Sequence, residues 1–561
     1  MKSSESTRPF EIERLRSDFP LIATSSDCYF DNAATTQKPS DVLNAMDSYY
    51  RHSNANVHRA AHKLSRLATE SFEAARQRVQ QFLNAGHTDE IIWTRGTTEG
   101  INLVAHSFGQ QAIGAGDEIL ISVLEHHANI VPWQLLAQRS GAVLRVIPIN
   151  NDGDLDQAAY AEMLNPRTKL VAICHVSNAL GTVNPVAEMI QQAHSVGAKI
   201  LIDGAQAVSH FQIDVQALDC DFYLFSGHKL YGPTGIGVLY GKQQLLQMMP
   251  PWQAGGEMIE QVSFESTTFL PPPFRFEAGT PNIAAAIGLA AAIRYLNRFD
   301  LSQRQAHEQG LLDHAIMRLS QLPRLRIIGH PQHRTGLLPF VIDGIHSFDL
   351  GTLLDQHGIA LRTGHHCAMP LHRQLGLEGT VRASFGLYNR IDEIDRLADT
   401  LSELLTQHPI NSHKAPPLTS ASTPIPQHQE ASLLQQLLRL EHWAARYALL
   451  MKMAQAQASD SALRQDQHIL HGCSSKVWLD YRYHGDDNSL HYQIDSDTRI
   501  IKGLGLLLLE LFNGKNPQQI IDLALDELFL KLGLVQHLST SRSNGLEAIV
   551  KEIKQIATMH Q

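Results

Sequence analysis

Residues 199–208 read KILIDGAQAV, and residues 222–241 read FYLFSGHKLYGPTGIGVLYG. Each stretch begins with a short apolar run that is typical of a buried strand, and each run ends in polar residues. Asp203 ends the first run, and Lys229 follows the second run among glycines and apolar residues. A carboxylate at the end of a buried strand is costly unless it caps a helix or faces a cation. Asp203 alone leaves both explanations open.

Similar apolar, β-branched runs recur on the N-terminal side of these two stretches. They occupy residues 91–94, 118–123, 144–149 and 169–176, and they alternate with segments of helical spacing at 70–83, 132–140 and 186–196. Continuous apolar strands that alternate with helices predict an α/β fold, in which helices cover both faces of a mostly parallel sheet. Ligands of such folds bind beyond the carboxyl ends of the strands. The residues that follow each strand are therefore the candidates for chemistry.

Those residues together match the needs of pyridoxal 5'-phosphate. This cofactor requires a lysine for its Schiff base, an acid for its pyridine nitrogen and a cradle for its phosphate. Lys229 and Asp203 meet the first two needs. The stretch RGTTEG (95–100) opens a predicted helix and offers N–H groups and hydroxyls to an anion. Further donors are Ser226 and His228, and the stretch EHHAN (125–129) adds the imidazole of His126 for stacking and proton transfer.

The five cysteines lie far apart and form no CxxC pair, so we expect neither a structural zinc site nor a disulfide framework. Such cysteine usage suits a reducing cytosol. Three of the thiols, Cys28, Cys174 and Cys220, lie in or near apolar segments and are predicted to be buried and inert. Cys367 instead lies in the polar loop RTGHHCA, where Arg362, His365 and His366 favour a thiolate. Cys367 is the predicted nucleophile.

Composition narrows the class of protein further. The chain has 561 residues, of which 43% are hydrophobic and 18% are charged, and its formal net charge is −10. These values fit a globular protein and count against binding to nucleic acid. The nearest candidate for a membrane span, Leu504 to Phe512, is too short to cross a bilayer and contains Glu510. The first residues lack the apolar core of a secretory signal, so we expect a cytoplasmic protein without membrane association.

Residues 407–430 contain five prolines and no aromatic residue. This composition predicts a flexible linker, and the alternative is an ordered surface loop. The following part is predicted to be α+β: a helix over 432–456, two antiparallel strands with a turn at 485–488, and helices within 500–514, 517–533 and 541–557. Its 13 Lys/Arg and 14 Asp/Glu nearly cancel, so it has no electrostatic bias toward nucleic acid.

The longer first part resembles a known enzyme family. Residues 10–405 resemble the group II (SufS-type) cysteine desulfurases, which are fold-type I pyridoxal-phosphate enzymes. The resemblance rests on YFDNAATTQKP, NVHRAAHKLS, RGTTEGINLVA, EHHANIVPW, HVSNALGT, IDGAQAV, SGHKLYGPTGIGVLYG, FEAGTPN, RTGHHCAMP and VRASFGLYN. It implies a large domain over about 20–290 and a small α+β domain over about 291–406 that also takes in the N-terminus.

The resemblance also implies roles for individual residues. Lys229 carries the cofactor, Asp203 pairs with the pyridinium, Gln206 contacts the ring hydroxyl, and His126 stacks on the ring. The implied phosphate ligands are Thr97, Thr98, Ser226 and His228, joined by Thr280 from the other subunit of a homodimer. The implied ligands of the substrate carboxylate are Asn178 and Arg382.

Arg382 has a physical argument of its own. The stretch VRAS places it inside an apolar strand pattern, where an unpaired guanidinium is penalised. A planar guanidinium that faces an α-carboxylate removes this cost, and a structural salt bridge is the alternative.

Residues 433–558 resemble the SufE-type sulfur acceptors, through GCSSKVW, DSDTRIIKGL and LSTSRSNGLEAIVKEI. By this resemblance Cys473 is the acceptor thiol and Arg542 has a supporting role. His471 departs from the family, which often has proline at this position. We therefore divide the chain into a desulfurase at 1–406, a linker at 407–430 and an acceptor domain at 431–561.

The resulting hypothesis is a desulfurase with its own sulfur acceptor. L-Cysteine becomes L-alanine, Cys367 takes the sulfur as a persulfide, and Cys473 receives it for an iron–sulfur scaffold or another sulfur-accepting protein. Three alternatives remain: a selenocysteine lyase, an aminotransferase, which would need neither Cys367 nor the C-terminal part, and a non-catalytic assembly scaffold. Neither the final sulfur recipient nor whether Cys473 acts within one subunit or across the dimer follows from the sequence.

Overall fold

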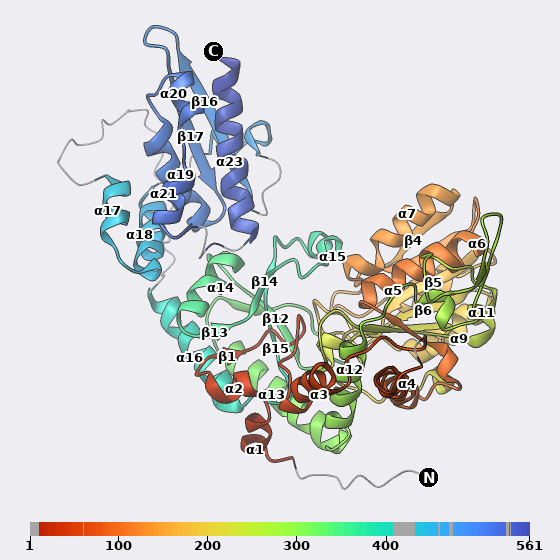
Figure 1. The fold of residues 1–561 in the computed structure, drawn as a ribbon. Helices are drawn as coiled ribbons and strands as arrows, with labels where there is room; N and C mark the ends of the chain where they lie inside the picture. The colour runs from red at the N-terminus through yellow and green to blue at the C-terminus, as the bar shows by residue number, and fades with distance from the viewer. Residues whose placement is uncertain are drawn as a thin grey trace. The chain divides into compact units, whose positions relative to one another are not determined.

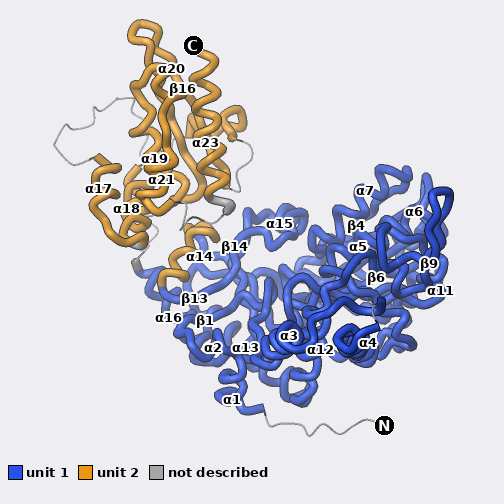
Figure 2. Tube along the Cα trace, viewed as in Figure 1, with its two compact units in different colours: residues 1–343, 357–408 blue, residues 344–356, 409–561 orange. Residues whose placement is uncertain are grey.

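The computed structural model describes residues 10–59, 61–407, 432–457, 461–470, 475–534, 538 and 540–561 (Figure 1). The chain forms two compact units (Figure 2). The first takes the described residues within 1–343 and 357–408, and the second takes those within 344–356 and 409–561. The predicted linker lies outside the described residues, apart from Gln407 at the end of a helix, and Cys473 also lies outside them.

A seven-stranded sheet is the centre of the first unit. In spatial order its strands are β2 (Ile91–Thr94), β8 (Gly237–Gly241), β7 (Phe222–Ser226), β6 (Lys199–Asp203), β5 (Thr168–Cys174), β3 (Glu118–Ser122) and β4 (Val143–Ile147). β8 runs antiparallel to both of its neighbours, β2 and β7, and the other strand pairs of this sheet are parallel. The predicted mostly parallel sheet is confirmed, and β8 makes it mixed.

Side chains alternate between two apolar layers because successive residues of a strand point to opposite faces. On one face, Leu201, Leu224 and Leu239 pack against α5 (Thr97–Val104), η2 (Ala105–Gly109), α7 (Val131–Ser140) and α11 (Gln243–Met248). On the other, Ile200, Ile202 and Phe225 pack against α4 (Lys63–Leu83), α9 (Val186–Ser195) and α12 (Ile283–Leu296). Burial on both faces explains why the strands are continuous apolar runs.

Smaller sheets complete the first unit. An antiparallel sheet has the order β11 (Leu325–Ile327), β12 (Leu337–Ile342), β15 (Thr380–Ser384) and β14 (Arg362–Gly364). Two further pairs are β1 (Cys28–Tyr29) with β13 (Ile359–Ala360), and β9 (Ile259–Val262) with β10 (Thr267–Phe269). The remaining helices are α1 (Ile12–Ser17), α2 (Pro20–Thr24), α3 (Ser40–His52), η1 (Thr88–Glu90), α6 (Gln110–Ala112), η3 (His127–Asn129), α8 (Gln157–Met163), α10 (Val215–Leu218), η4 (Gly227–Lys229), η5 (Phe274–Phe276), α13 (Leu301–Ser320), α15 (Met369–Gln374) and α16 (Ile391–Gln407).

The second unit has its own apolar core, built on a β-hairpin and helices. Its elements are α14 (Ser347–Gln356), α17 (Leu433–Arg439), α18 (Trp443–Ala456), η6 (Asp466–His468), β16 (Val477–His484), β17 (Ser489–Ser496), α19 (Arg499–Phe512), α20 (Pro517–Asp522), α21 (Asp526–Lys531) and α23 (Thr540–Met559). β16 and β17 pair antiparallel in the register Val477↔Ser496 to His484↔Ser489. The predicted hairpin and its turn at 485–488 are confirmed.

Two helix predictions in this unit were wrong. The expected helix over 432–456 breaks into α17 and α18 because Leu440 is extended. The side chain of Arg446 donates to the carbonyl of Leu437, which replaces a helical hydrogen bond at the break. The expected helix over 517–533 likewise divides into α20 and α21, where the Lys554 amine binds the carbonyls of Ile521 and Leu523. In both cases a distant side chain satisfies the carbonyls that a continuous helix would use.

No helix among the described residues is long and apolar enough to cross a membrane.

Candidate active site

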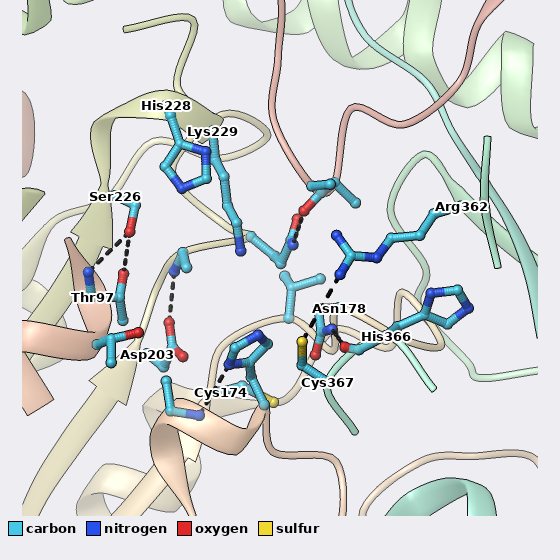
Figure 3. A pocket seen from close by; sticks show the side chains of 18 of the residues that line it. Thr97, Cys174, Asn178, Asp203, Ser226, His228, Lys229, Arg362, His366 and Cys367 are labelled. Carbon is cyan, nitrogen blue, oxygen red and sulfur yellow. Dashed lines mark hydrogen bonds between the residues drawn. The ribbon is translucent and has the colours of Figure 1, made fainter. Parts of the chain in front are cut away.

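A cavity of about 230 Å³ lies at the carboxyl ends of the central strands. It gathers most of the residues that the sequence predicted for the site (Figure 3). The predicted residues that line it are Thr97, Thr98, His126, Asn178, Asp203, Gln206, Ser226, His228, Lys229, Cys367 and Arg382. Most of them follow strands of the central sheet, whose parallel topology brings them to one edge, whereas Cys367 comes from the loop after β14 and Arg382 from β15 of the antiparallel sheet.

One end of the cavity is rich in neutral hydrogen-bond donors. Thr97 begins α5, its backbone N–H donates to Ser226 Oγ over 2.9 Å, and the two hydroxyl oxygens are also 2.9 Å apart. Burial lowers the pKa of His228 to about 4, so its ring is neutral at pH 7. N–H groups at the start of a helix, together with hydroxyls, suit an anionic group such as a phosphate.

Asp203 and Lys229 lie on neighbouring strand ends in the middle of the cavity (Figure 3). Asp203 Oδ1 accepts the backbone N–H of Ala205 over 2.9 Å, and burial raises the pKa of this carboxyl. Among the described residues Asp203 forms no ion pair. Burial lowers the pKa of Lys229 to about 8, and the Asp203 carboxylate opposes that shift. A lowered pKa makes the neutral amine of Lys229 more available near pH 7, as a reaction with a carbonyl requires. The buried carboxyl of Asp203 beside it still lacks a cationic partner among the described residues.

The backbone beside these two residues requires glycine. A Cβ at Gly204 would lie 2.2 Å from the ring of Tyr223, and one at Gly237 would lie 2.5 Å from Gly96 Cα. Either contact would push the strand ends apart. Gly204 therefore allows close packing directly after Asp203, and Gly237 allows β8 to approach the turn that precedes α5.

His126 has a defined tautomer. Its Nδ1 accepts the backbone N–H of Ala128 over 3.0 Å, so the proton of the neutral ring is on Nε2. Burial, together with the charge of Lys229, lowers the pKa of His126 to about 3. The ring is thus neutral at all physiological pH values, as stacking on an aromatic ring requires.

Two arginines line the other end of the cavity. Arg362 and Arg382 stand directly opposite each other on β14 and β15, which is unfavourable for like charges unless an anion is near. Arg382 is buried, donates to Asp31 Oδ1 over 3.1 Å and to the carbonyl of Asn178 over 2.7 Å, and its Nε has no partner among the described residues. Arg382 therefore forms a structural salt bridge with Asp31 and still has an N–H group that a substrate carboxylate could accept.

Cys367 lies in the loop after β14, with a left-handed backbone (φ 57°). Its carbonyl accepts the backbone N–H of His127 over 2.7 Å, and Arg362 Nη2 lies 3.9 Å from its Sγ (Figure 3). A non-glycine residue with positive φ is held there by its surroundings. These contacts fix the loop and place a positive charge beside a half-buried thiol.

The prediction that His366 favours a thiolate at Cys367 was wrong. Burial and the nearby Arg382 charge lower the pKa of His366 far below 6.5, and its Nε2 lies 2.9 Å from Thr380 Oγ1. A neutral ring supplies no positive charge to Cys367. Instead, the carbonyl of His366 accepts Asn178 Nδ2 over 2.5 Å, which ties the cysteine loop to the turn after β5.

The predicted inert cysteines are buried. Burial raises the pKa of Cys28 to about 11 and raises that of Cys220 beyond its ordinary value. Cys174 also lines the cavity, which the sequence did not indicate. Burial and the carboxyls of Glu125 and Asp203 raise its pKa well above 9.

Two residues of the site escaped the sequence analysis. Asp31 pairs with Arg382, and Glu125 holds the end of β5 by accepting Cys174 N over 3.0 Å and Asn129 Nδ2 over 2.7 Å. The signal for Asp31 was a carboxylate directly after the apolar residues of YFDNAATTQKP. The signal for Glu125 was its place next to His126.

Three predicted residues are not in this cavity. Thr280 is exposed and lines a separate cavity of about 510 Å³ with Trp93, Arg95 and Trp252. Its expected role toward another subunit stays a prediction. Cys473 lies outside the described residues, and Arg542 lies in α23 with a side chain that is not described.

Comparison with known sequences identifies the fold. Residues 28–397 match the aminotransferase class-V family. The chain belongs to this family. Residues 431–557 match SufE, the Fe-S metabolism associated domain, so the class-V enzyme is fused to a C-terminal SufE domain. The class-V part has the fold-type I architecture, as the sequence predicted.

Relatives and solved structures cover the class-V part. The cysteine desulfurase of Dickeya dadantii is 53% identical over 400 residues, which are 70% of this chain and 97% of the relative. That of Synechococcus elongatus is 51% identical over 401 residues, which are 71% of this chain but only 64% of the relative. The crystal structure of the cysteine desulfurase CsdA from Escherichia coli superposes with a TM-score of 0.68 at 43% identity, over 71% of this chain and 100% of that one.

Class-V aminotransferases depend on pyridoxal 5'-phosphate, and the residues of this cavity fit that cofactor. The buried Asp203 without an ion pair fits the pyridinium, and Lys229 with its lowered pKa fits the aldehyde. The donors of Thr97, Thr98, Ser226 and His228 fit the phosphate.

Proposed function

We propose that this chain is a pyridoxal-phosphate-dependent cysteine desulfurase that passes sulfur from Cys367 to Cys473 of its own SufE domain. The observation that carries the proposal is that Lys229 and Cys367 line one cavity, with Arg382 and Asn178 beside them. An amine for the cofactor, ligands for a carboxylate and a thiol for sulfur are the parts that this reaction needs. Names of the relatives support cysteine as the substrate.

The substrate carboxylate binds Arg382 and Asn178. Asp31 already holds one nitrogen of the guanidinium, so its orientation is set before substrate arrives. The opposed charge of Arg362 adds attraction for the anion. Preorganised charge of this kind lowers the cost of binding because little side-chain freedom is lost.

Lys229 moves the proton at Cα. The bound cofactor supplies the electron sink for the charge that develops on that carbon. With a pKa of about 8, a usable share of the lysine is neutral at pH 7–8 and can accept the proton. Asp203 holds a positive charge on the pyridine nitrogen, which its burial among apolar strands strengthens.

Cys367 then attacks the substrate sulfur as a thiolate. A sulfur–sulfur bond forms, the carbon–sulfur bond breaks, and its electron pair stays on the substrate carbon, which takes a proton. The products are L-alanine and a persulfide on Cys367, so atoms and electrons balance. The Arg362 guanidinium at 3.9 Å stabilises the attacking anion.

The final step resembles thiol–disulfide exchange. The Cys473 thiolate attacks the outer sulfur of the persulfide, which frees the Cys367 thiolate. We infer that residues 407–430 act as a tether for the acceptor domain. If the tether is flexible, a chain of this length has an r.m.s. span of roughly 25–29 Å, which limits how far the acceptor can move from the desulfurase. The local concentration of acceptor is then on the order of millimolar.

Several finer features belong to this proposal. The desulfurase spans 1–406, the acceptor spans 431–561, and two copies form a cytoplasmic homodimer in which Thr280 serves the partner's phosphate. The sulfur goes on to an iron–sulfur scaffold or another sulfur-accepting protein, and the desulfurase is of the group II type. The match to the Fe-S metabolism associated domain supports this destination.

The direct test is a single turnover of the full chain with L-cysteine. We expect one L-alanine and one sulfur adduct on Cys367 for each active site. Selenocysteine as substrate separates the alternative activity, because its elimination should depend far less on Cys367. A Cys367→Ser variant that retained full activity on L-cysteine would contradict the proposal and favour a lyase that needs no thiol.

A further inference from the structure

Lys38 lies behind the turn that carries Lys229, on the segment between β1 and α3. Its Nζ donates to the carbonyl oxygen of His228 over 3.2 Å, to Thr35 Oγ1 over 3.4 Å and to the carbonyl oxygen of Thr36. The peptide group whose oxygen it holds is the one that supplies the N–H of Lys229. Lys38 is therefore bound to the backbone of the site, although it is not among the residues that line the cavity.

Several donors converge on this one carbonyl. Besides Lys38, the backbone N–H and the hydroxyl of Thr36 both donate to it over 3.0 Å, and Thr35 Oγ1 donates over 3.3 Å. The Thr36 hydroxyl also accepts the backbone N–H of Tyr231 over 2.8 Å. Residues 35–38 therefore form hydrogen bonds to the backbone on both sides of Lys229, which hold the turn in place.

The charge of Lys38 has no counter-ion. Its contacts are neutral oxygens, and it forms no ion pair with any carboxylate of the described residues. The amine is half-buried, and burial lowers its pKa to about 8. An ammonium group that is withdrawn from water without an anion is costly, so its presence indicates a functional role for the charge.

The cradle for the phosphate lacks a cation of its own. Thr97, Thr98 and Ser226 are uncharged, and His228 is neutral at pH 7. Arg95 nearby is exposed and already paired with Glu99 at 2.8 Å. A phosphate with a charge of roughly −1.5 to −2 that binds Thr97, Thr98, Ser226 and His228 would therefore meet neutral donors at these four residues. Lys38 binds the carbonyl oxygen of His228 over 3.2 Å, and, besides burial, its charge helps to lower the pKa of the His228 ring, so it provides a positive charge close to this cradle.

We propose that Lys38 is a positioning residue that complements the phosphate charge of the cofactor from behind the His228–Lys229 peptide, without touching the phosphate. The inference rests on the cofactor dependence in the proposed function but not on cysteine as the substrate. A failure of cysteine turnover would leave it standing.

The test compares pyridoxal phosphate with pyridoxal, which lacks the phosphate. Both are titrated into the full-length apoprotein, and binding is followed by the visible absorbance that develops. In Lys38→Met, which keeps the length and loses the charge, we expect the affinity for pyridoxal phosphate to fall by about tenfold or more. Affinity for pyridoxal should change less than twofold.

The decisive quantity is the ratio of the two dissociation constants within each variant, because it does not depend on the fraction of folded protein. Lys38→Arg keeps the charge and should keep the wild-type ratio. Lys169→Met is the matched control: Lys169 lies at the N-terminal end of β5, away from the cradle, and pairs with Asp117 at 3.9 Å. An unchanged ratio in Lys38→Met, or the same change in Lys38→Arg, would overturn the proposal.

Discussion

Two cysteines line the same cavity from two different regions of the molecule. Cys174 ends β5 in the central sheet, fully enclosed, with the carboxyls of Glu125 and Asp203 as neighbours. Cys367 lies in a loop after β14, half-buried, with the Arg362 guanidinium 3.9 Å from its sulfur. Opposite charges act on two otherwise identical thiols. We infer that the environment of a thiol, and not its presence in the cavity, selects the nucleophile.

The largest effect should come from exchanging each sulfur for oxygen. Cys367→Ser should lower L-alanine production from L-cysteine at least about a thousandfold, because a serine cannot take the sulfur. Cys174→Ser should keep activity within twofold, since Asn184 Nδ2 and the Leu124 carbonyl next to its sulfur also suit a hydroxyl. Alanine release in a single turnover measures both. Similar losses in the two variants would contradict the claim that the environments of the two thiols give them different roles.

The next effect concerns stability around Cys174. Burial raises the pKa of Glu125 to about 7, against about 4.3 in an unfolded chain. Between these values the folded state holds a proton that the unfolded state has released, so the free energy of unfolding falls as pH rises through this window. Above pH 7 the accumulated loss is about 4 kcal/mol.

Glu125→Gln cannot ionise and should lack this slope. Urea unfolding of the full-length apoprotein, followed by tryptophan fluorescence at pH 5 and pH 7.5, gives the difference between wild type and variant. Trp133 reports on the region because its Nε1 donates to Asn129 Oδ1, and Asn129 in turn binds Glu125. A difference that is the same at both pH values would show that Glu125 keeps no proton on folding.

A smaller effect concerns the charge beside Cys367. Arg362→Gln removes the positive charge 3.9 Å from the Cys367 sulfur, so alkylation of this thiol at pH 7 should slow by about tenfold. Iodoacetamide labelling followed by peptide mass analysis measures Cys367 and Cys174 in the same sample. Cys174 should remain unlabelled in both proteins. An unchanged alkylation rate at Cys367 would show that Arg362 does not activate this thiol.

The strands and most of the site could be predicted because a buried parallel strand leaves an unambiguous pattern. Runs such as ILI (200–202) and FYLF (222–225) are apolar throughout, and parallel topology requires the residues after them to meet at one edge. Asp203 and Lys229 came together for that reason. Together with the stretch at 95–100, Ser226, His228 and His126, these two residues indicated the cofactor.

The remainder depends on contacts between distant parts of the chain. Asp31 and Arg382 are 351 residues apart, and no local pattern pairs them. The sequence shows that His366 is a histidine but not that it is buried and neutral. The break between α17 and α18 contains neither proline nor glycine, and the Arg446 contact to Leu437 marks it only in the folded unit.

The central claim is that sulfur moves from Cys367 to Cys473 within one polypeptide. The most direct measurement is mass spectrometry of the full-length chain after a short exposure to L-cysteine, with peptides around both cysteines analysed for added sulfur. In wild type both peptides should gain sulfur, in Cys473→Ser sulfur should accumulate on Cys367, and in Cys367→Ser neither should gain it. Sulfur on Cys473 in the Cys367→Ser variant would contradict the relay.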